Sequence, residues 1–255
     1  MADAFLAALF EVYTPDEITR VTVKGSSRKP WDSPIDYVPT FSDVDIHVRY
    51  AAPPDPDRPY VSLEQGLRMQ EAVEDGYHRR VPAPLHVPRL QFLPVNVLET
   101  QPLYVPSPPS TVHVLYGTPP DVAEIDPETS RSAARSLLLD YRPYLRLLGE
   151  HVSEKSTPYL WDVLRQLTWR VAPAVPRALE VMGLPYEDAW GINRSTAVRR
   201  LEVAGKDELA HAYTSFYLHE WAFYLSGYSD AAAGRAIVAS AARVLALAVA
   251  IAESA

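Results

Sequence analysis

The chain has 255 residues, 47% of them hydrophobic and 22% charged, a composition typical of one large or two small globular domains. The sequence contains no cysteine, which excludes disulfides, thiolate metal ligands and a cysteine nucleophile. The net charge of −8 is uneven, because residues 1–128 carry −9 and residues 129–255 carry +1. A protein that grips long nucleic acid shows a basic face, so this charge argues against a long nucleic acid as partner.

Neither end of the sequence indicates secretion or a membrane. The start, MADAFLAALF, lacks the basic region of a signal peptide and contains Asp3. The longest apolar stretch, residues 236–252, is interrupted by Ser240 and Arg243, so we expect a buried alanine-rich helix there and no membrane span. Together with the absence of cysteine, these features favour a cytoplasmic location.

Hydrophobic periodicity in the first half predicts a mixed β-sheet with helices packed on one face. The expected elements are a helix over residues 2–13, strands over 21–24, 42–49, 89–99 and 112–116, and a helix over 62–81. In the last of these helices, Ser62 is the expected N-cap. The helical spacing predicts an inner stripe formed by Leu63, Leu67, either Gln70 or Val73, and Tyr77.

The second half has an almost wholly helical pattern. Helices are expected over residues 130–154 with a kink at Pro143, and over 158–170, 175–182, 186–203, 206–226 and 231–253. The sequence therefore predicts an α+β protein in which a sheet domain, residues 1–128, precedes an all-α bundle, residues 129–255.

The stretch from residue 21 to 48, VTVKGSSRKPWDSPIDYVPTFSDVDIHV, contains the most specific chemical signal. Its last part alternates as a strand does, which places Asp43 and Asp45 on one face with Cβ atoms about 7 Å apart. Two like charges held side by side repel each other unless a cation lies between them. A Mg²⁺ held by two carboxylates and substrate phosphates meets this need.

A turn with glycine and two serines comes before this strand. Gly25 permits close approach of the backbone to a ligand, and successive N–H groups with the Ser26 and Ser27 hydroxyls can bind phosphate oxygens. A phosphate-binding turn followed by a metal-holding strand is typical of metal-assisted phosphoryl or nucleotidyl transfer. The prolines between turn and strand predict a short or distorted helix followed by an irregular loop.

Gly25-Ser26 and Ser42-Asp43-Val44-Asp45 resemble the signature of the polymerase-β-like nucleotidyltransferase superfamily. The order of a sheet domain and a helical bundle, with VHVLYG at residues 112–117, is similar to the aminoglycoside nucleotidyltransferases of antibiotic resistance. The resemblance implies that a nucleotidyltransferase domain moves a nucleoside monophosphate, AMP in the first instance, from ATP or another triphosphate to a hydroxyl of a small acceptor such as an aminoglycoside.

The resemblance also implies roles for individual residues. Asp43 and Asp45 would hold Mg²⁺ or Mn²⁺. The residues expected to contact the nucleotide are Lys24, Gly25, Ser26, Ser27, Ser42 and Arg194. Trp190 and Asn193 are expected in the acceptor cleft. For Arg194, the alternative is an ordinary surface arginine. The neighbouring cations Arg28 and Lys29 would help Lys24 to neutralise the triphosphate.

Members of this superfamily usually carry a third carboxylate on a later strand, and Gln91 lies at the matching position. Glutamine is not a base, so three readings remain open. Glu99, the nearest carboxylate, or His47 acts as general base; the substrate loses its proton without a protein base; or the enzyme is degenerate. The alternative functions are therefore a nucleotide-binding or regulatory protein, and an antitoxin-type nucleotidyltransferase that acts on a protein partner.

Overall fold

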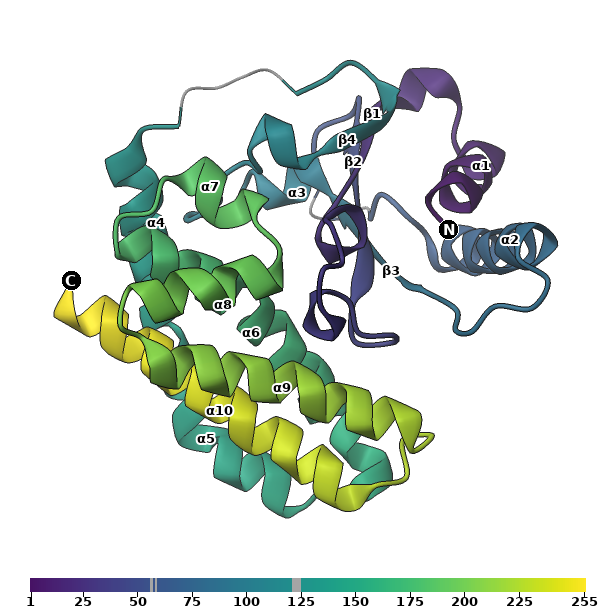
Figure 1. Ribbon diagram of the computed structural model, residues 1–255. Coiled ribbons are helices and arrows are strands. Elements are labelled where there is room, and N and C mark those ends of the chain that lie inside the picture. Colours follow the sequence, from purple (N-terminus) through teal and green to yellow (C-terminus); the bar gives the residue numbers. More distant parts are fainter. Residues whose placement is uncertain (56, 58, 121–124) are drawn as a thin grey trace. The chain divides into compact units, whose positions relative to one another are not determined.

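The structure, a computed structural model, describes residues 1–55, 57, 59–120 and 125–255 (Figure 1). It confirms an α+β fold with a four-stranded mixed sheet and a helical C-terminal region. Two compact units are distinguished: unit 1 is Met1–Arg28 with Ser42–Ala123, and unit 2 is Lys29–Phe41 with Glu124–Ala255. Residues 56, 58 and 121–124 lie outside the described residues, and they fall in the proline-rich stretches 51–59 and 118–130 that the sequence predicts as loops.

Unit 1 contains the sheet. Its elements are α1 (Ala2–Val12), η1 (Pro15–Glu17), β1 (Ile18–Lys24), η2 (Ser26–Arg28), β2 (Asp43–Tyr50), α2 (Leu63–Arg80), β3 (Arg89–Pro94), α3 (Val95–Leu98), η4 (Pro109–Thr111) and β4 (His113–Gly117). The strand order is β3-β2-β1-β4. β1 pairs antiparallel with β2 and β4, whereas β2 and β3 are parallel and are joined through α2. The short 3₁₀ turn η2 confirms the short, distorted helix expected after the glycine-serine turn.

Helices α1 and α2 lie side by side and cover one face of the sheet (Figure 1). Phe5 of α1 packs against Phe92 of β3, and Val73 of α2 belongs to the same buried cluster. Ser62 caps α2 as expected, accepting from Gln65 N at 3.2 Å. The expected inner stripe of α2 is wrong at its start, because Leu63 and Leu67 are 81% and 61% exposed and the helix buries Met69, Val73, Gly76 and Tyr77 instead.

The third strand is shorter than expected. β3 ends at Pro94, and the chain then forms the helical turn α3 instead of continuing to residue 99 as a strand. The Asn96 side chain accounts for the change: its Oδ1 accepts from Tyr50 N at 2.9 Å and its Nδ2 donates to Tyr50 O at 3.1 Å. A side-chain amide thus takes the hydrogen bonds that a further strand residue would make, and the backbone turns away.

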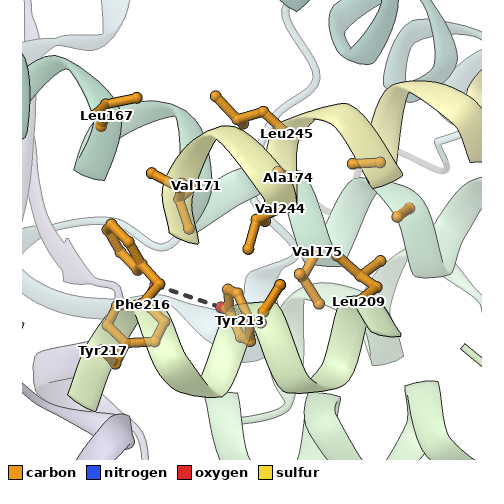
Figure 2. Close-up of a cluster of buried hydrophobic side chains, with 14 of the residues drawn as sticks. Leu167, Val171, Ala174, Val175, Leu209, Tyr213, Phe216, Tyr217, Val244 and Leu245 are labelled. Atoms are coloured by element: carbon orange, nitrogen blue, oxygen red, sulfur yellow. Dashed lines mark hydrogen bonds between the residues drawn. The ribbon is translucent and has the colours of Figure 1, made fainter. Parts of the chain in front are cut away.

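Unit 2 is built from helices around one apolar core. Its elements are η3 (Pro34–Asp36), α4 (Pro127–Leu139), α5 (Tyr141–Ser153), η5 (Thr157–Tyr159), α6 (Leu160–Val181), α7 (Tyr186–Gly191), α8 (Arg194–Val203), α9 (Asp207–Leu225) and α10 (Ala231–Ser254). Figure 2 shows part of the core, where Leu167 and Val171 of α6 lie with Tyr213 and Phe216 of α9 and Val244 of α10.

The helix boundaries in unit 2 differ from expectation in three places. The helix expected over 130–154 is broken at Asp140 rather than kinked at Pro143, and the helix over 186–203 is broken before Asn193. Conversely, α6 continues through Pro173 and Pro176, where we expected two helices. A proline inside a helix costs about 3 kcal/mol or more. Both prolines lie on the partly exposed side of α6, and the fully buried residues on its other side offset this cost.

Helix α10 is the one helix in the described part of the chain that is long and apolar enough to cross a membrane, judged by length and composition. Ile237, Val244, Leu245 and Ala248 are fully buried in the core of unit 2. The expectation of a buried alanine-rich helix is therefore confirmed.

The segment between the two sequence motifs, residues 29–41, belongs to unit 2 and not to the sheet. Ile35, Val38 and Phe41 are part of the helical core, and Phe41 stacks on Trp161 with ring centroids 5.3 Å apart. Trp221 Nε1 donates to Pro34 O at 2.6 Å. The irregular loop expected here is thus a fixed element that includes the 3₁₀ turn η3.

Asp36 fastens this segment. Its carboxylate is 2% exposed and accepts four hydrogen bonds, from Asp32 N at 3.0 Å, Ser33 N at 2.9 Å, Ser195 N at 2.8 Å and Ser195 Oγ at 2.9 Å. Ser195 lies in the first turn of α8, where the unpaired N–H groups and the helix dipole favour an anion. One buried carboxylate therefore joins a proline-rich segment to a helix that is about 160 residues away in sequence.

Replacing Asp36 with asparagine should destabilise unit 2 by about 3 kcal/mol, because an amide group would then face backbone N–H donors that now bond to a carboxylate. Urea unfolding followed by far-ultraviolet circular dichroism measures this change. Asp188→Asn, at an exposed aspartate of α7, is the matched control and should cost less than about 0.5 kcal/mol. Equal costs for the two variants would contradict the role assigned to Asp36.

Candidate functional site

The polar face of the sheet in unit 1 brings together the residues of both motifs. In the register of the strands, Asp45 lies between Lys24 of β1 and Gln91 of β3, and Asp43 lies beside Arg89 of β3. Residues directly opposite each other on neighbouring strands point to the same face. The two acids therefore share one face with two cations and one amide, while the other face of the sheet packs on α1 and α2.

Gly25 holds the turn directly against Asp45. Its φ of +87° is a conformation that residues with a side chain rarely adopt. A Cβ atom built at this position would lie 2.0 Å from Asp45 Oδ2. The turn continues into η2 through the hydrogen bond from Arg28 N to Gly25 O at 3.1 Å. The glycine is thus required twice, for its backbone angle and for the space that the carboxylate fills.

Gln91 links the two acids. Its amide faces carboxylate oxygens, so the orientation that pairs donor with acceptor directs Nε2 toward them. In this orientation Nε2 donates to Asp43 Oδ2 at 2.7 Å and to Asp45 Oδ1 at 2.9 Å. A carboxylate at position 91 would face two others here, whereas the amide lowers the repulsion between Asp43 and Asp45.

Arg89 forms an ion pair with Asp43 through its Nη2. The Asp43 side chain is 16% exposed and that of Arg89 is 27% exposed, so the pair is only partly accessible to water. Arg89 was not among the residues predicted from the sequence. The pattern that could have identified Arg89 is its position two residues before Gln91 in an alternating strand, because this spacing puts both side chains on the same face.

The buried end of this face holds Lys24 and His47. Lys24 Nζ donates to Ser107 Oγ at 2.8 Å, and burial lowers the Lys24 pKa while the nearby Asp45 raises it. Burial, and then the positive charge of Lys24, lower the pKa of His47 to about 3. His47 is therefore neutral at physiological pH and too weakly basic to serve as an efficient general base.

Glu99 is not brought to the two acids. It caps the end of α3 and pairs with Arg49. Arg49 lies four residues beyond Asp45 on β2, which corresponds to about 13 Å along the strand. Neither Gln91, at the position of the third acid, nor Glu99, the nearest carboxylate, therefore supplies an acid beside Asp43 and Asp45.

The serines expected to contact phosphate lie in or beside the two motifs. Ser26 and Ser27 are half-buried in η2, where Ser27 Oγ lies 3.5 Å from Lys24 O. Ser42 is 1% exposed, directly before β2. Phosphate contact by the turn backbone and by the Ser26 and Ser27 hydroxyls stays a prediction.

Two bundle residues that were expected to contact nucleotide or acceptor form hydrogen bonds with residues 29–41 of unit 2. Asn193 Nδ2 donates to Pro30 O at 3.1 Å and to Asp32 Oδ2 at 2.8 Å, and its Oδ1 caps α8. Arg194 Nη1 donates to Ile35 O at 2.9 Å while its guanidinium lies 3.9 Å from the Tyr217 ring centroid.

The same applies to Lys29 and Trp190. Lys29 Nζ donates to the carbonyls of Trp190, at 2.6 Å, and Ile192, at 2.8 Å, so its ammonium is bonded within unit 2. For Trp190 the contact involves only the backbone carbonyl. Ligand contact by Trp190, Asn193 or Arg194 stays a prediction.

Comparison with protein-family models, with curated proteins and with solved structures finds no match to the chain. Within the described residues there is also no group of three or more His, Cys, Asp or Glu side chains that could hold a metal ion. What the site offers is two adjacent carboxylates and a glycine turn packed on one of them.

Gly25→Ala tests this packing, and Gly183→Ala is the matched control. Gly183 also has a positive φ, of +101°, but a Cβ there would meet no atom within 4 Å. We expect about 1–2 kcal/mol of destabilisation at Gly183 from backbone strain alone. At Gly25 we expect at least about 1 kcal/mol more, because Asp45 must leave its hydrogen bond with Gln91. Urea unfolding of both variants measures the difference, and equal costs would contradict the packing argument.

Proposed function

We propose that unit 1 binds the phosphates of a nucleoside triphosphate and transfers the nucleoside monophosphate, AMP in the first instance, to a hydroxyl of a small acceptor such as an aminoglycoside. The observation that carries the proposal is the contact of the Gly25 turn with Asp45, beside Asp43 on the same strand face. It supports a site in which a phosphate-binding backbone and two carboxylates meet. We place this activity in the cytoplasm on the sequence features alone.

The donor set fits one divalent cation that arrives with phosphate. Mg²⁺ is usually held by one or two carboxylates, with the remaining positions taken by phosphate oxygens and water. Asp43 and Asp45 would hold Mg²⁺ or Mn²⁺, and the missing Cβ of Gly25 leaves room for the Asp45 carboxylate beside the turn. When bound, the cation would neutralise phosphate charge and stabilise the charge that develops during transfer.

The protein groups around the site would position substrates rather than move protons. Backbone N–H groups of the turn would orient the phosphates, and the two carboxylates would fix their distance from β2. Gln91 has no basic atom, Glu99 lies with Arg49, and His47 has a pKa of about 3. In-line nucleotidyl transfer is carried largely by positioning and charge stabilisation, so the proposed reaction does not require a protein base.

The acceptor is proposed to be small. Unit 1 carries more than half of the net negative charge of the chain, since residues 1–28 and 42–123 hold 9 Lys+Arg and 14 Asp+Glu, a net charge of −5 out of −8. Such a surface repels polyanions and attracts cations. A polycationic aminoglycoside satisfies this preference and supplies the hydroxyl groups that the reaction needs.

Calorimetric titration with a non-hydrolysable ATP analogue tests the site. For the native protein we expect Mg²⁺ to tighten binding at least about tenfold, and for Asp45→Asn we expect that effect to be lost, because one anionic ligand is removed. Asp75→Asn, at an exposed aspartate of α2, is the control and should bind as the native protein does. Mg²⁺-dependent binding that survives in Asp45→Asn would contradict the assignment, as would a native protein that binds no triphosphate.

Release of pyrophosphate then separates transfer from binding. The native protein is incubated with Mg²⁺, ATP and a panel of aminoglycosides, and pyrophosphate is measured with and without each acceptor. Acceptor-dependent release that disappears in Asp43→Asn is the result expected for a transferase.

A second candidate function, binding of the triphosphate without transfer, is favoured by Gln91. The amide takes the place where a third acid would serve as general base, and it donates to both remaining acids. The position thus stabilises the site at rest and adds nothing basic to it.

Gln91→Glu should destabilise unit 1 by about 1–3 kcal/mol without divalent cations, because two hydrogen bonds are replaced by repulsion among three carboxylates. Saturating Mg²⁺ should restore much of this loss by binding the folded state. Thermal unfolding with and without Mg²⁺ measures both effects, with Gln101→Glu at an exposed glutamine as control. A variant as stable as the control would contradict the bridging role. A silent native protein made active by Gln91→Glu would establish the second candidate function.

A further inference from the structure

The ion pair between Arg89 and Asp43 places a positive charge on one of the two acids proposed to hold the divalent cation. Both side chains are mostly buried, and Asp43 Oδ2 accepts from Arg89 Nη2 and from Gln91 Nε2 together. An entering cation therefore meets a carboxylate that is already neutralised and hydrogen-bonded.

The guanidinium of Arg89 does not bind the Asp43 carboxylate in a bidentate arrangement. Arginine bonds a carboxylate most firmly through two parallel N–H groups. Here Nη2 contacts Asp43, while Nε is buried without a hydrogen-bond partner in the described part of the chain. Breaking the pair gives up one charge-assisted contact and allows the Nε donor to find a partner, so the arginine is held less firmly than its burial suggests.

We infer that Arg89 is an internal counter-cation of the site, which a divalent cation must displace from Asp43 before it can bind. The inference rests on the proposed function, since it concerns the cation that Asp43 and Asp45 would hold. Arg89 and the divalent cation compete for Asp43. The positive charge of Arg89 stabilises the acids in the absence of the cation and opposes its entry. Arg89 thereby sets the concentration of divalent ion at which the site fills, and it favours ions that arrive with phosphate over bare ions.

Arg49 is an internal comparison for this effect. It lies on the same strand face as Asp43, is also partly exposed, and forms an ion pair with Glu99. Its distance from Asp43 is six residues along β2, about 20 Å, where solvent and salt screen its charge. Removal of Arg49 changes the net charge by the same amount without freeing a candidate cation ligand.

The test is a titration with Mn²⁺ alone, with free ion measured by electron paramagnetic resonance. Compared with the native protein, Arg89→Gln should bind Mn²⁺ roughly fivefold or more tightly, because a like charge next to the ion is removed. Arg89→Lys, which keeps the charge, should remain near the native value, and Arg49→Gln should stay within about twofold. Circular dichroism confirms folding, and Arg89→Met, which keeps the apolar stem, provides the same comparison if Arg89→Gln does not fold.

The outcomes separate the inference from the function on which it rests. Equal Mn²⁺ affinity in Arg89→Gln and Arg49→Gln, with binding lost in Asp43→Asn, would overturn the counter-cation role and leave the cation site in place. Mn²⁺ binding that is unaffected by Asp43→Asn would overturn the site and the inference together, and so would an absence of Mn²⁺ binding from Arg89→Gln, in which the competing charge has been removed. Tighter binding in Arg89→Gln that Asp43→Asn abolishes would establish the competition.

Discussion

Two carboxylates on one face of a strand impose the constraint around which unit 1 is arranged. Asp43 and Asp45 are too close to remain charged side by side without compensation, and the structure supplies it from both neighbouring strands. Arg89 pairs with Asp43, and Lys24 lies opposite Asp45 in the register. The Gln91 amide donates to both acids. The consequences extend to His47, which Lys24 and burial keep neutral on the same face.

Segment 29–41 lies directly between the two motifs in the chain, although it belongs to unit 2. The chain leaves unit 1 directly after η2 and returns to it at Ser42, one residue before Asp43. Each motif is thus joined by its own backbone to a segment that Asp36 fastens to α8.

The sequence predicted what local patterns determine and missed what depends on tertiary neighbours. Alternation placed Asp43 and Asp45 on one face, because strand periodicity is local. Gln91 was identified through the resemblance, at the position where the superfamily carries a third carboxylate. The pairing of Arg89 with Asp43 depends on the parallel register of β2 and β3, which no local pattern specifies. The exposure of Leu63 and the turn at Asn96 likewise depend on where α2 and β3 meet the rest of unit 1. In unit 2, the resemblance implied ligand contact for Asn193 and Arg194, which stays a prediction, and no local pattern predicted their hydrogen bonds to residues 29–41.

The charge balance of the site at rest bears on how a cation would enter it. Two acids, one arginine and one lysine leave the cluster near neutrality, and the amide of Gln91 adds no charge. A site with three carboxylates repels itself until a cation binds, so it gains stability from a resident ion. In this cluster the side chains of Arg89, Lys24 and Gln91 already compensate the two acids. A bare ion therefore adds less stability than it would at a site with three carboxylates. On the proposed function, the divalent cation is therefore a companion of the triphosphate rather than a permanent part of the protein, because phosphate oxygens supply the negative charge that the compensated acids no longer provide.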